Sequence, residues 1–180
     1  MMGNREWSLS AEEKKRILRE RARLLARAPD EIISANNIEI IEFSLAHERY
    51  GVESVYVRAV HLLKDLTPVP GAPDFVLGVV NLRGEIISIV DIKRFFNLPL
   101  KGITDLNRIL VLSNDHMEFG LLADELLGAR MIAADNMQSS LPLASDILSK
   151  YLKGITTEGL IVLDGEKILS DEGMLIDKKL

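Results

Sequence analysis

The residues best suited to chemistry in this chain are three histidines and two aspartates that follow apolar stretches. His47, His61 and His116 have none of the spacings that metal sites use, and the chain contains no cysteine. Asp91 and Asp164 are a pair of carboxylates, the residue type that general acid and base catalysis requires. Each aspartate precedes a short amphipathic segment, however, and an aspartate in that place is typical of a helix N-cap. We therefore expect no metal site, no cofactor and no enzymatic activity.

The most distinctive segment of the sequence lies between residues 75 and 99. Two apolar stretches of strand length, 76–80 and 86–90, are joined by the residues N-L-R-G at positions 81–84. Stretches of β-branched and large apolar residues bounded by polar or glycine residues are typical of buried strands. The segment therefore predicts two antiparallel strands joined by an exposed turn.

Two glycines and an arginine in this segment indicate its local geometry and exposure. Gly84 can adopt the positive φ that a tight turn requires, and Gly78 indicates a bulge or the close approach of another backbone. Arg83 must be exposed at such a turn. It is either a solvated turn residue or an anchor for a partner protein.

This segment resembles the chemotaxis coupling protein (CheW) family, in which the pattern G-x-x-N-L-R-G-x-x-x-x-x-x-D carries a hairpin near the partner-binding surface. The chain has each residue of the pattern, namely Gly78, Asn81, Leu82, Arg83, Gly84 and Asp91. The resemblance extends over about residues 37–175. It implies a mainly β fold of two small five-stranded, SH3-like or OB-like barrels packed about a shared apolar seam. It also implies a non-catalytic adaptor that couples chemoreceptors to a histidine kinase of the CheA type.

The resemblance also suggests where the partners bind. The first barrel is expected to contact the regulatory domain of the kinase, and the groove between the barrels to take the cytoplasmic tip of a methyl-accepting chemoreceptor. The residues expected at these contacts are Val57, Ala59, His61, Gly78, Val80, Asn81, Arg83 and Gly84. Ala59 departs from the family, because many members have an acidic residue at this position, so an ion pair made there is absent or replaced.

The rest of the chain shows a weak internal repeat of short apolar stretches. Further strands are expected at residues 38–43, 48–52, 55–63, 108–112, 118–123, 126–133, 154–157 and 160–163, with a polar loop at 135–149. Residues 47–52 are echoed by residues 116–121, and residues 83–91 by residues 158–164. Two similar halves predict two barrels, with the chain crossing between them near residues 98–105. A seam between two barrels also leaves open a second function, that of a regulatory domain that binds a small molecule there.

The charge of the chain divides it into a basic extension and an acidic body. Residues 1–28 contain eight Lys or Arg and four Glu, whereas residues 29–180 contain 14 basic and 23 acidic residues. An acidic body argues against nucleic-acid binding, which needs a basic face. The chain has no run of about 18 apolar residues and no signal peptide, so we expect a cytoplasmic protein that is not an integral membrane protein. The resemblance implies that it is recruited to membrane receptor arrays.

The basic residues of the extension belong to a predicted helix at residues 10–28. Ser10 and Glu13 form a capping box, and Pro29 ends the pattern. Its narrow apolar stripe leaves three interpretations open: packing against its own domain, contact with a partner or a second copy, and binding to an anionic membrane or nucleic acid. We therefore predict an extension at residues 1–36 and a CheW-like domain at residues 37–180.

Overall fold

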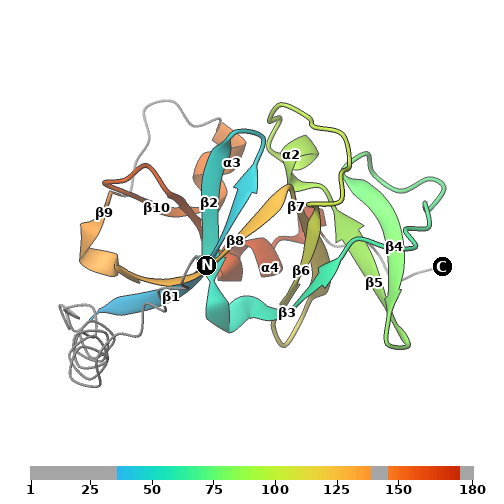
Figure 1. Cartoon of the computed structure of the whole chain (residues 1–180), viewed down its shortest axis with the longest axis horizontal. Helices are drawn as coiled ribbons and strands as arrows, with labels where there is room; N and C mark the ends of the chain where they lie inside the picture. The colour runs from blue at the N-terminus through green and yellow to red at the C-terminus, as the bar shows by residue number, and fades with distance from the viewer. Residues whose placement is uncertain (1–35, 139–145, 175–180) are drawn as a thin grey trace, which may run out of the picture. The chain divides into compact units, whose positions relative to one another are not determined.

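The computed structural model describes residues 36–138 and 146–174, which form two β-sheets and a few short helices (Figure 1). The predicted helix at residues 10–28 lies outside the described residues. The mainly β fold predicted from the sequence is confirmed. In the short apolar stretches that form strands, successive residues alternate between a more buried face and a more exposed one.

The first sheet has six strands in the order β8-β1-β2-β11-β10-β9. Its strands are β1 (Asn37–Leu45), β2 (Glu48–Glu53), β8 (Glu125–Ala133), β9 (Met137–Gln138), β10 (Leu152–Thr156) and β11 (Ile161–Leu163). All neighbouring strands are antiparallel except β11 and β2, which are parallel.

The second sheet has five strands in the order β3-β6-β7-β5-β4. Its strands are β3 (Val57–Leu62), β4 (Val76–Leu82), β5 (Glu85–Val90), β6 (Arg108–Ser113) and β7 (Glu118–Ala123). Here β5 and β7 are the parallel pair. Strands β3 and β4 are therefore the two outer strands of this sheet.

The helices are short and lie next to the strands in the sequence. They are α2 (Ile92–Phe95), α3 (Asp146–Tyr151) and α4 (Gly165–Leu169), with 3-10 turns at Ser54–Tyr56, Ala134–Asn136 and Glu172–Met174. Helix α3 includes residues 146–149, where the sequence predicted a loop, so that part of the loop prediction is wrong. Its buried Leu148 and Tyr151, separated by one turn, provide the apolar contacts that hold the helix in place.

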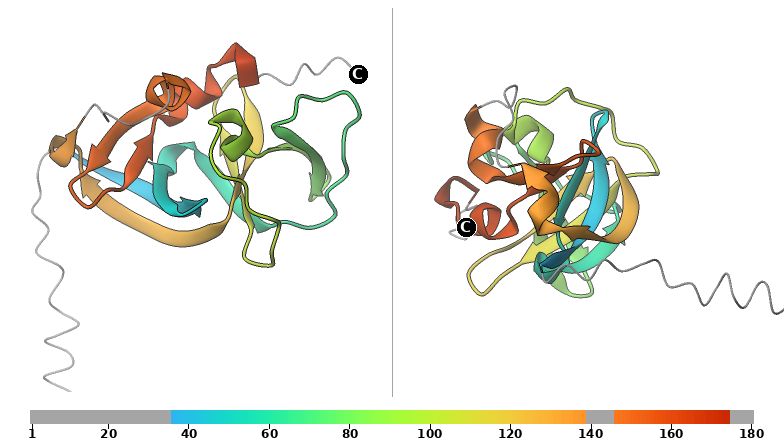
Figure 2. Two further views of the ribbon diagram at one scale, coloured as in Figure 1. Left: turned by 90° about the horizontal axis from the view of Figure 1, so that it is seen from above. Right: turned by 90° about the vertical axis from the view of Figure 1, so that its left-hand side faces the viewer.

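The chain passes from one sheet to the other twice, and neither crossing is where the sequence placed it. The first crossing is the 3-10 turn at Ser54–Tyr56, and the second is Asp124, between β7 and β8. Figure 2 shows the two sheets side by side. Residues 98–107 instead connect α2 to β6 beside the same five-stranded sheet, so the crossing predicted near residues 98–105 is wrong. The sequence-based expectation assumed that each half of the chain forms its own sheet.

The internal repeat does correspond to repeated structure, but the two halves exchange strands. The hairpin β1–β2 of the first half pairs with β11 of the second half, with Gly51 opposite Val162. The hairpin β6–β7 of the second half pairs with β5 of the first half, with Gly120 opposite Ile89. Each sheet therefore contains strands from both halves of the chain.

Three clusters of buried side chains hold this arrangement together. One cluster lies among the strands of the five-stranded sheet and includes Ile89 and Val111. A second lies among the strands of the six-stranded sheet and includes Ile40 and Val162. The largest cluster contains residues from both sheets and from or next to helices α2, α3 and α4, among them Phe43, Tyr50, Leu112, Phe119 and Tyr151. This cluster is the shared apolar seam, and it is filled by side chains.

The pairing of the strands does not by itself close either sheet into a barrel. Among the described residues, no ladder of hydrogen bonds joins β8 to β9 or β3 to β4, so the pairing gives two sheets and not two closed barrels. The predicted count of five strands is right for one sheet, and the other has six. The sixth strand is β9, whose two residues pair with Ile155 and Thr156 at the edge of the sheet.

Candidate protein-binding site

Strand β3 lies at the edge of the five-stranded sheet, where β6 is its one pairing partner among the described strands. Its outward face carries three exposed residues, Arg58, Val60 and Leu62. The residues selected from the sequence, Val57, Ala59 and His61, alternate with these and are half-buried. Val57 packs against the shared cluster and Ala59 against the cluster of the five-stranded sheet.

Sequence reasoning therefore missed the outward residues of this strand. The run Val57–Leu62 is largely apolar, so its alternation does not show which residues face the core. The ladder also shifts its register between Val57 and Ala59, which places an irregularity beside Arg58. The basic side chain of Arg58 was the one signal for the outward face, since charged residues are rarely buried.

The hairpin β4–β5 carries the N-L-R-G motif at its tip. Leu82 pairs with Glu85, so the connection is a two-residue turn made of Arg83 and Gly84. Both residues have positive φ, 57° and 95° respectively. Two positive φ angles in a two-residue hairpin turn are the signature of a type I′ turn, whose twist matches that of the strands. The prediction that Gly84 adopts positive φ is confirmed.

Asn81 and Arg83 have different functions within this turn. The Asn81 side-chain oxygen accepts a hydrogen bond from the backbone N–H of Gly84 at 2.8 Å, which explains why the turn is preceded by asparagine. Arg83 is exposed and occupies the left-handed region, where a residue with a Cβ is strained by about 1–2 kcal/mol. The turn thus keeps a strained, solvent-exposed arginine at its tip, where glycine or asparagine would fit better.

Gly78 and Val80 shape the hairpin from inside. Val80 is 2% exposed and belongs to the cluster of the five-stranded sheet. Gly78 has φ 150° at a shift in the β4–β5 register, and a Cβ built on it would lie 2.8 Å from the Thr67 carbonyl carbon and closer still to its oxygen. Both expectations for Gly78, a bulge and a close backbone approach, are confirmed. These two residues are therefore placed to set the form of the hairpin, and a partner would not reach their side chains directly.

The strand β3 and the hairpin come together in space. A hollow of about 430 Å³ is lined by Val60, His61 and Leu62 from β3 and by Asn81 and Leu82 from β4, together with Lys64 and Asp65. Arg58 also forms ion pairs with Glu85 at the hairpin tip and with Glu118 on β7, the latter at 2.8 Å. Its hydrogen bond with Glu85 raises the pKa of the Arg58 guanidinium.

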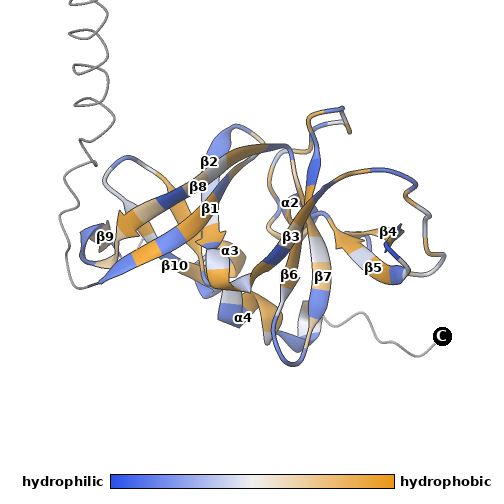
Figure 3. Cartoon of the chain, turned by 60° about the horizontal axis from the view of Figure 1, so that its bottom comes forward, coloured by the Kyte–Doolittle hydropathy of each residue, from blue (hydrophilic) through white to orange (hydrophobic). Residues whose placement is uncertain are grey.

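These contacts define one surface, which we call the β3–hairpin face. It consists of the exposed residues Arg58, Val60, Leu62, Asn81, Arg83 and Ile86. Ile86 pairs with Asn81 across the hairpin and is 64% exposed, which is unusual for an isoleucine in a strand. The hydrophilic tip of the hairpin is visible beside β5 in Figure 3. An apolar surface with an arginine beside it is typical of a protein interface.

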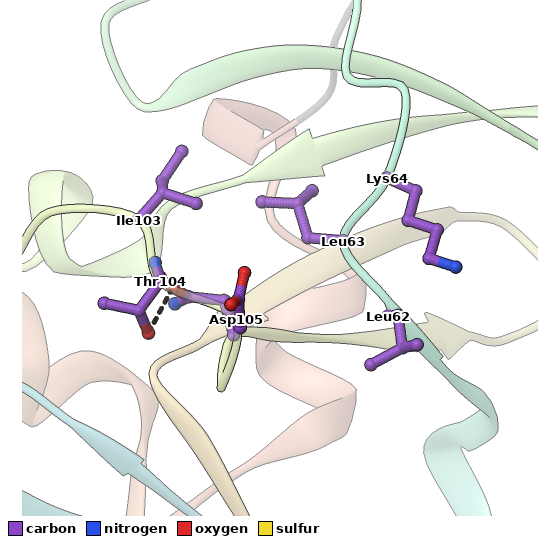
Figure 4. Close-up of a pocket in the computed structure, with 7 residues that line it drawn as sticks. Leu62, Leu63, Lys64, Ile103, Thr104 and Asp105 are labelled. Carbon is purple, nitrogen blue, oxygen red and sulfur yellow. Dashed lines mark hydrogen bonds between the residues drawn. The ribbon is translucent and has the colours of Figure 1, made fainter.

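A second hollow extends this face at the end of β3 (Figure 4). It measures about 360 Å³ and is lined by Leu62, Leu63, Lys64, Ile103, Thr104, Asp105 and Asn107. The Asn107 side-chain oxygen accepts a hydrogen bond from the backbone N–H of Thr104 at 2.5 Å, and its amide donates to the Ala123 carbonyl at 3.0 Å. Asn107 therefore fixes the loop so that the exposed Ile103 borders the same hollow as Leu62.

Another exposed apolar surface lies on the six-stranded sheet. Strand β8 is an outer strand and directs Leu127, Ala129 and Met131 outward. Met131 pairs with Glu39 of β1, whose carboxylate accepts a hydrogen bond from Ser54 at 2.6 Å, next to the highly exposed Val55. We call the surface formed by Leu127, Ala129 and Met131 the β8 face.

The two aspartates considered for catalysis are helix N-caps, as predicted. Asp91 accepts a hydrogen bond from the backbone N–H of Lys93 at 3.2 Å, and Asp164 accepts one from the backbone N–H of Lys167 at 3.1 Å. Burial raises the pKa of Asp91, against the opposing effects of Lys93 and Arg94. Both carboxylates therefore serve as N-caps, Asp91 for α2 and Asp164 for α4.

Two further observations concern the described residues as a whole. Within residues 36–138 and 146–174, no group of three His, Asp or Glu side chains converges as a metal ion requires. No helix in the same part of the chain is long and apolar enough to cross a membrane.

Comparison with known proteins agrees with this geometry. Residues 39–173 match the family model of the CheW-like domain. The chain is 27% identical over 147 residues to the chemotaxis protein CheW of Treponema pallidum, which covers 78% of this chain and 86% of that protein. It is 33% identical over 138 residues to the chemotaxis protein CheW of Thermotoga maritima, which covers 75% of this chain and 86% of that protein.

A solved structure gives the same result for the fold. The scaffolding protein TtCheW from Thermoanaerobacter tengcongensis superimposes with a TM-score of 0.63 at 28% identity, covering 70% of this chain and 83% of that one. The family match spans the hairpin with its N-L-R-G turn, both sheets and the shared cluster between them. The chain therefore belongs to the CheW-like domain family.

Proposed function

We propose that this protein is a non-catalytic adaptor that couples chemoreceptors to a histidine kinase of the CheA type. The observation that carries the proposal is the presence of two separate exposed apolar surfaces, the β3–hairpin face and the β8 face, on different sheets of one unit. An adaptor with two faces binds two partners at once and raises their effective concentration. It transmits the state of one partner as a change in the free energy of binding the other.

The kinase regulatory domain would bind at the β3–hairpin face. Support comes from four of the eight residues expected from the sequence, namely Asn81, Arg83 and Gly84 at the turn and His61, which lines the hollow. Val57, Ala59, Gly78 and Val80 would support the face from behind. Many relatives have an acidic residue at the position of Ala59. Here the half-buried Ala59 packs against the core, so the charged contact on this strand would come from the neighbouring Arg58.

The helical tip of a chemoreceptor would bind at the β8 face. Leu127, Ala129 and Met131 form an outward apolar stripe, and Val55 lies across Glu39 from that stripe. A stripe of this kind suits the apolar face of an amphipathic helix. This placement is close to the expected groove between the two halves, because Val55 belongs to the turn where the chain crosses between the sheets.

The remaining expectations form part of the same proposal. The protein would have no cofactor and would act in the cytoplasm, recruited to membrane receptor arrays. Residues 37–180 would be the CheW-like unit, with two barrel-like halves, and residues 1–36 an extension to it. The alternative of a small molecule bound in the seam has no support, because large buried side chains fill the seam.

Paired variants in a binding assay test this proposal. Arg83→Ala should weaken binding to the kinase regulatory domain and leave receptor binding unchanged, whereas Met131→Glu should do the reverse. Lys167→Ala, which removes an exposed basic side chain on α4, is the matched control and should change neither. Binding of wild-type protein to neither partner would contradict the proposal, as would equal effects of both variants on both partners.

A further inference from the structure

Lys93 is a lysine buried in the protein, with its side chain 1% exposed. It lies in α2, two residues after the N-cap Asp91, and its ammonium group forms an ion pair with the carboxylate of Asp124. The Asp91 carboxylate lies 3.9 Å from the same ammonium group. Lysine is almost never fully buried unless it is paired, so this site has a specific structural use.

Asp124 connects the two sheets. It is the residue at which the chain crosses from β7 in the five-stranded sheet to β8 in the six-stranded sheet. One oxygen of its carboxylate binds Lys93, which follows the five-stranded sheet, and the other accepts a hydrogen bond from the backbone N–H of Ala46 at 2.7 Å. Ala46 lies in the β1–β2 turn of the six-stranded sheet and has φ 58°. The Asp124 backbone N–H also donates to the Ser44 carbonyl at 3.0 Å.

The energetics of buried ion pairs indicate what this contact contributes. Removing two charges from water is costly, so a buried pair is often no more stabilising than apolar residues of similar size. Apolar contacts such as those of the shared cluster are also not directional, and they permit small shifts of one sheet over the other. A charged contact with fixed hydrogen-bond geometry does not tolerate such shifts, because a displaced partner leaves a buried charge unpaired.

We propose that Lys93 is a positioning residue, whose buried ion pair with Asp124 fixes the orientation of the five-stranded sheet relative to the six-stranded sheet. Through this orientation it sets the relative placement of the β3–hairpin face and the β8 face. This consequence rests on the function proposed above, whereas the effect on the orientation does not.

Distance measurements between spin labels test the inference directly. Because the chain has no cysteine, label pairs can be introduced without removing any residue that reacts with the label. Asp115→Cys in the β6–β7 turn and Thr157→Cys in the β10–β11 turn report on the two sheets, and neither position is buried. Asp105→Cys with Asp115→Cys, at the two ends of β6, is the control pair within one sheet.

Three variants separate orientation from stability. Lys93→Met leaves the Asp124 carboxylate without its ion pair and is expected to lower the melting temperature. The double variant below keeps the inference testable if this single variant fails to fold. Lys93→Met combined with Asp124→Asn removes both charges of this ion pair and should fold, because Asp91 keeps Arg94 as a partner at 3.8 Å, while Lys93→Arg keeps the charge. In the folded double variant, the distance distribution between the sheets should broaden or shift while the control pair stays unchanged, and Lys93→Arg should retain the narrow distribution. An unchanged distribution between the sheets in the folded double variant would overturn the inference.

Binding measurements then distinguish this inference from the proposed function. The double variant should bind each partner alone nearly as well as wild type, but the factor by which the receptor tip changes kinase affinity should fall toward one. If wild-type protein binds neither partner, the proposed function fails while the distance result still decides the role of Lys93.

Discussion

The side-chain oxygen of Asn81 accepts a hydrogen bond from the backbone N–H of Gly84 at 2.8 Å, and this bond closes the turn that presents Arg83. The contact gives a physical reason for the order of residues in the N-L-R-G motif. Asparagine caps the turn, leucine is the last residue of β4, and glycine takes the second positive φ. Within residues 36–138 and 146–174, the Arg83 side chain forms no hydrogen bond or ion pair that would support the hairpin, which is why we propose that it contacts a partner.

Replacing Arg83 should separate folding from binding. Arg83→Gly relieves a left-handed residue of its Cβ, so the free energy of unfolding should stay the same or rise by about 1 kcal/mol. Arg83→Ala keeps the strain and should change stability by less than about 0.5 kcal/mol. Both variants should weaken binding to the kinase regulatory domain by about tenfold or more, equal to about 1.4 kcal/mol. Thermal melts and titrations measure the two effects, and a loss of stability without a loss of affinity would make Arg83 a structural residue.

Gly78 should be intolerant of any side chain. Gly78→Ala would bring a Cβ against the Thr67 carbonyl at a φ of 150°, so we expect a loss of about 2–4 kcal/mol in the free energy of unfolding. Gly102→Ala is the control, because a Cβ there has no atom within 4 Å. Chemical denaturation compares the two, and similar stabilities would show that the bulge is not needed for the hairpin.

Much of the strand pattern could be predicted from the sequence because it depends on local signals. The β-branched runs indicated the strands, and aspartate before a short amphipathic segment indicated the N-caps Asp91 and Asp164. Gly78 and Gly84 could be interpreted because a glycine within an apolar strand typically marks a bulge, and a glycine at a hairpin turn typically has positive φ. These features depend on neighbouring residues alone.

Long-range features could not be predicted in the same way. Which strand completes which sheet depends on the pairing of β5 with β7 and of β11 with β2, and nothing in the sequence specifies these partners. The outward face of β3 depends on its register with β6. Lys93 has the sequence context of a surface lysine in an amphipathic segment, because its partner Asp124 is 31 residues away.

The exchange of strands predicts how fragments of the chain should behave. A cut between the exposed residues Lys101 and Gly102 separates β5 from β7 and β11 from β2. Neither fragment alone should fold, since each lacks strands on which its buried clusters depend, but an equimolar mixture should regain the β-sheet signal in circular dichroism. A cooperative unfolding transition in either isolated fragment would contradict the exchange.

Two aspartates should give opposite dependences of stability on pH. Hydrogen bonds from Lys150 and Tyr151 lower the pKa of Asp171, so its contribution to stability is present at neutral pH and is lost as the pH falls through its folded pKa. Burial raises the pKa of Asp91, so its contribution is fully present below the unfolded pKa of about 3.9 and is lost as the pH rises through its folded pKa.

Asparagine variants measure these two effects. From acid to neutral pH, Asp171→Asn should become progressively less stable than wild type, whereas Asp91→Asn should become progressively more stable relative to wild type. Unfolding free energies at several pH values give both differences. Parallel trends for the two variants would show that the environment of one carboxylate differs from the one described.

The most direct test of the adaptor function is whether both partners bind at the same time. Wild-type protein should be titrated with the regulatory domain of a CheA-type kinase, first alone and then with a saturating concentration of a chemoreceptor tip fragment. We predict a complex of all three components in which the kinase domain binds at least as tightly as it does without the receptor fragment. Displacement of one partner by the other would contradict the account, because it would mean that the two proteins compete for a single face.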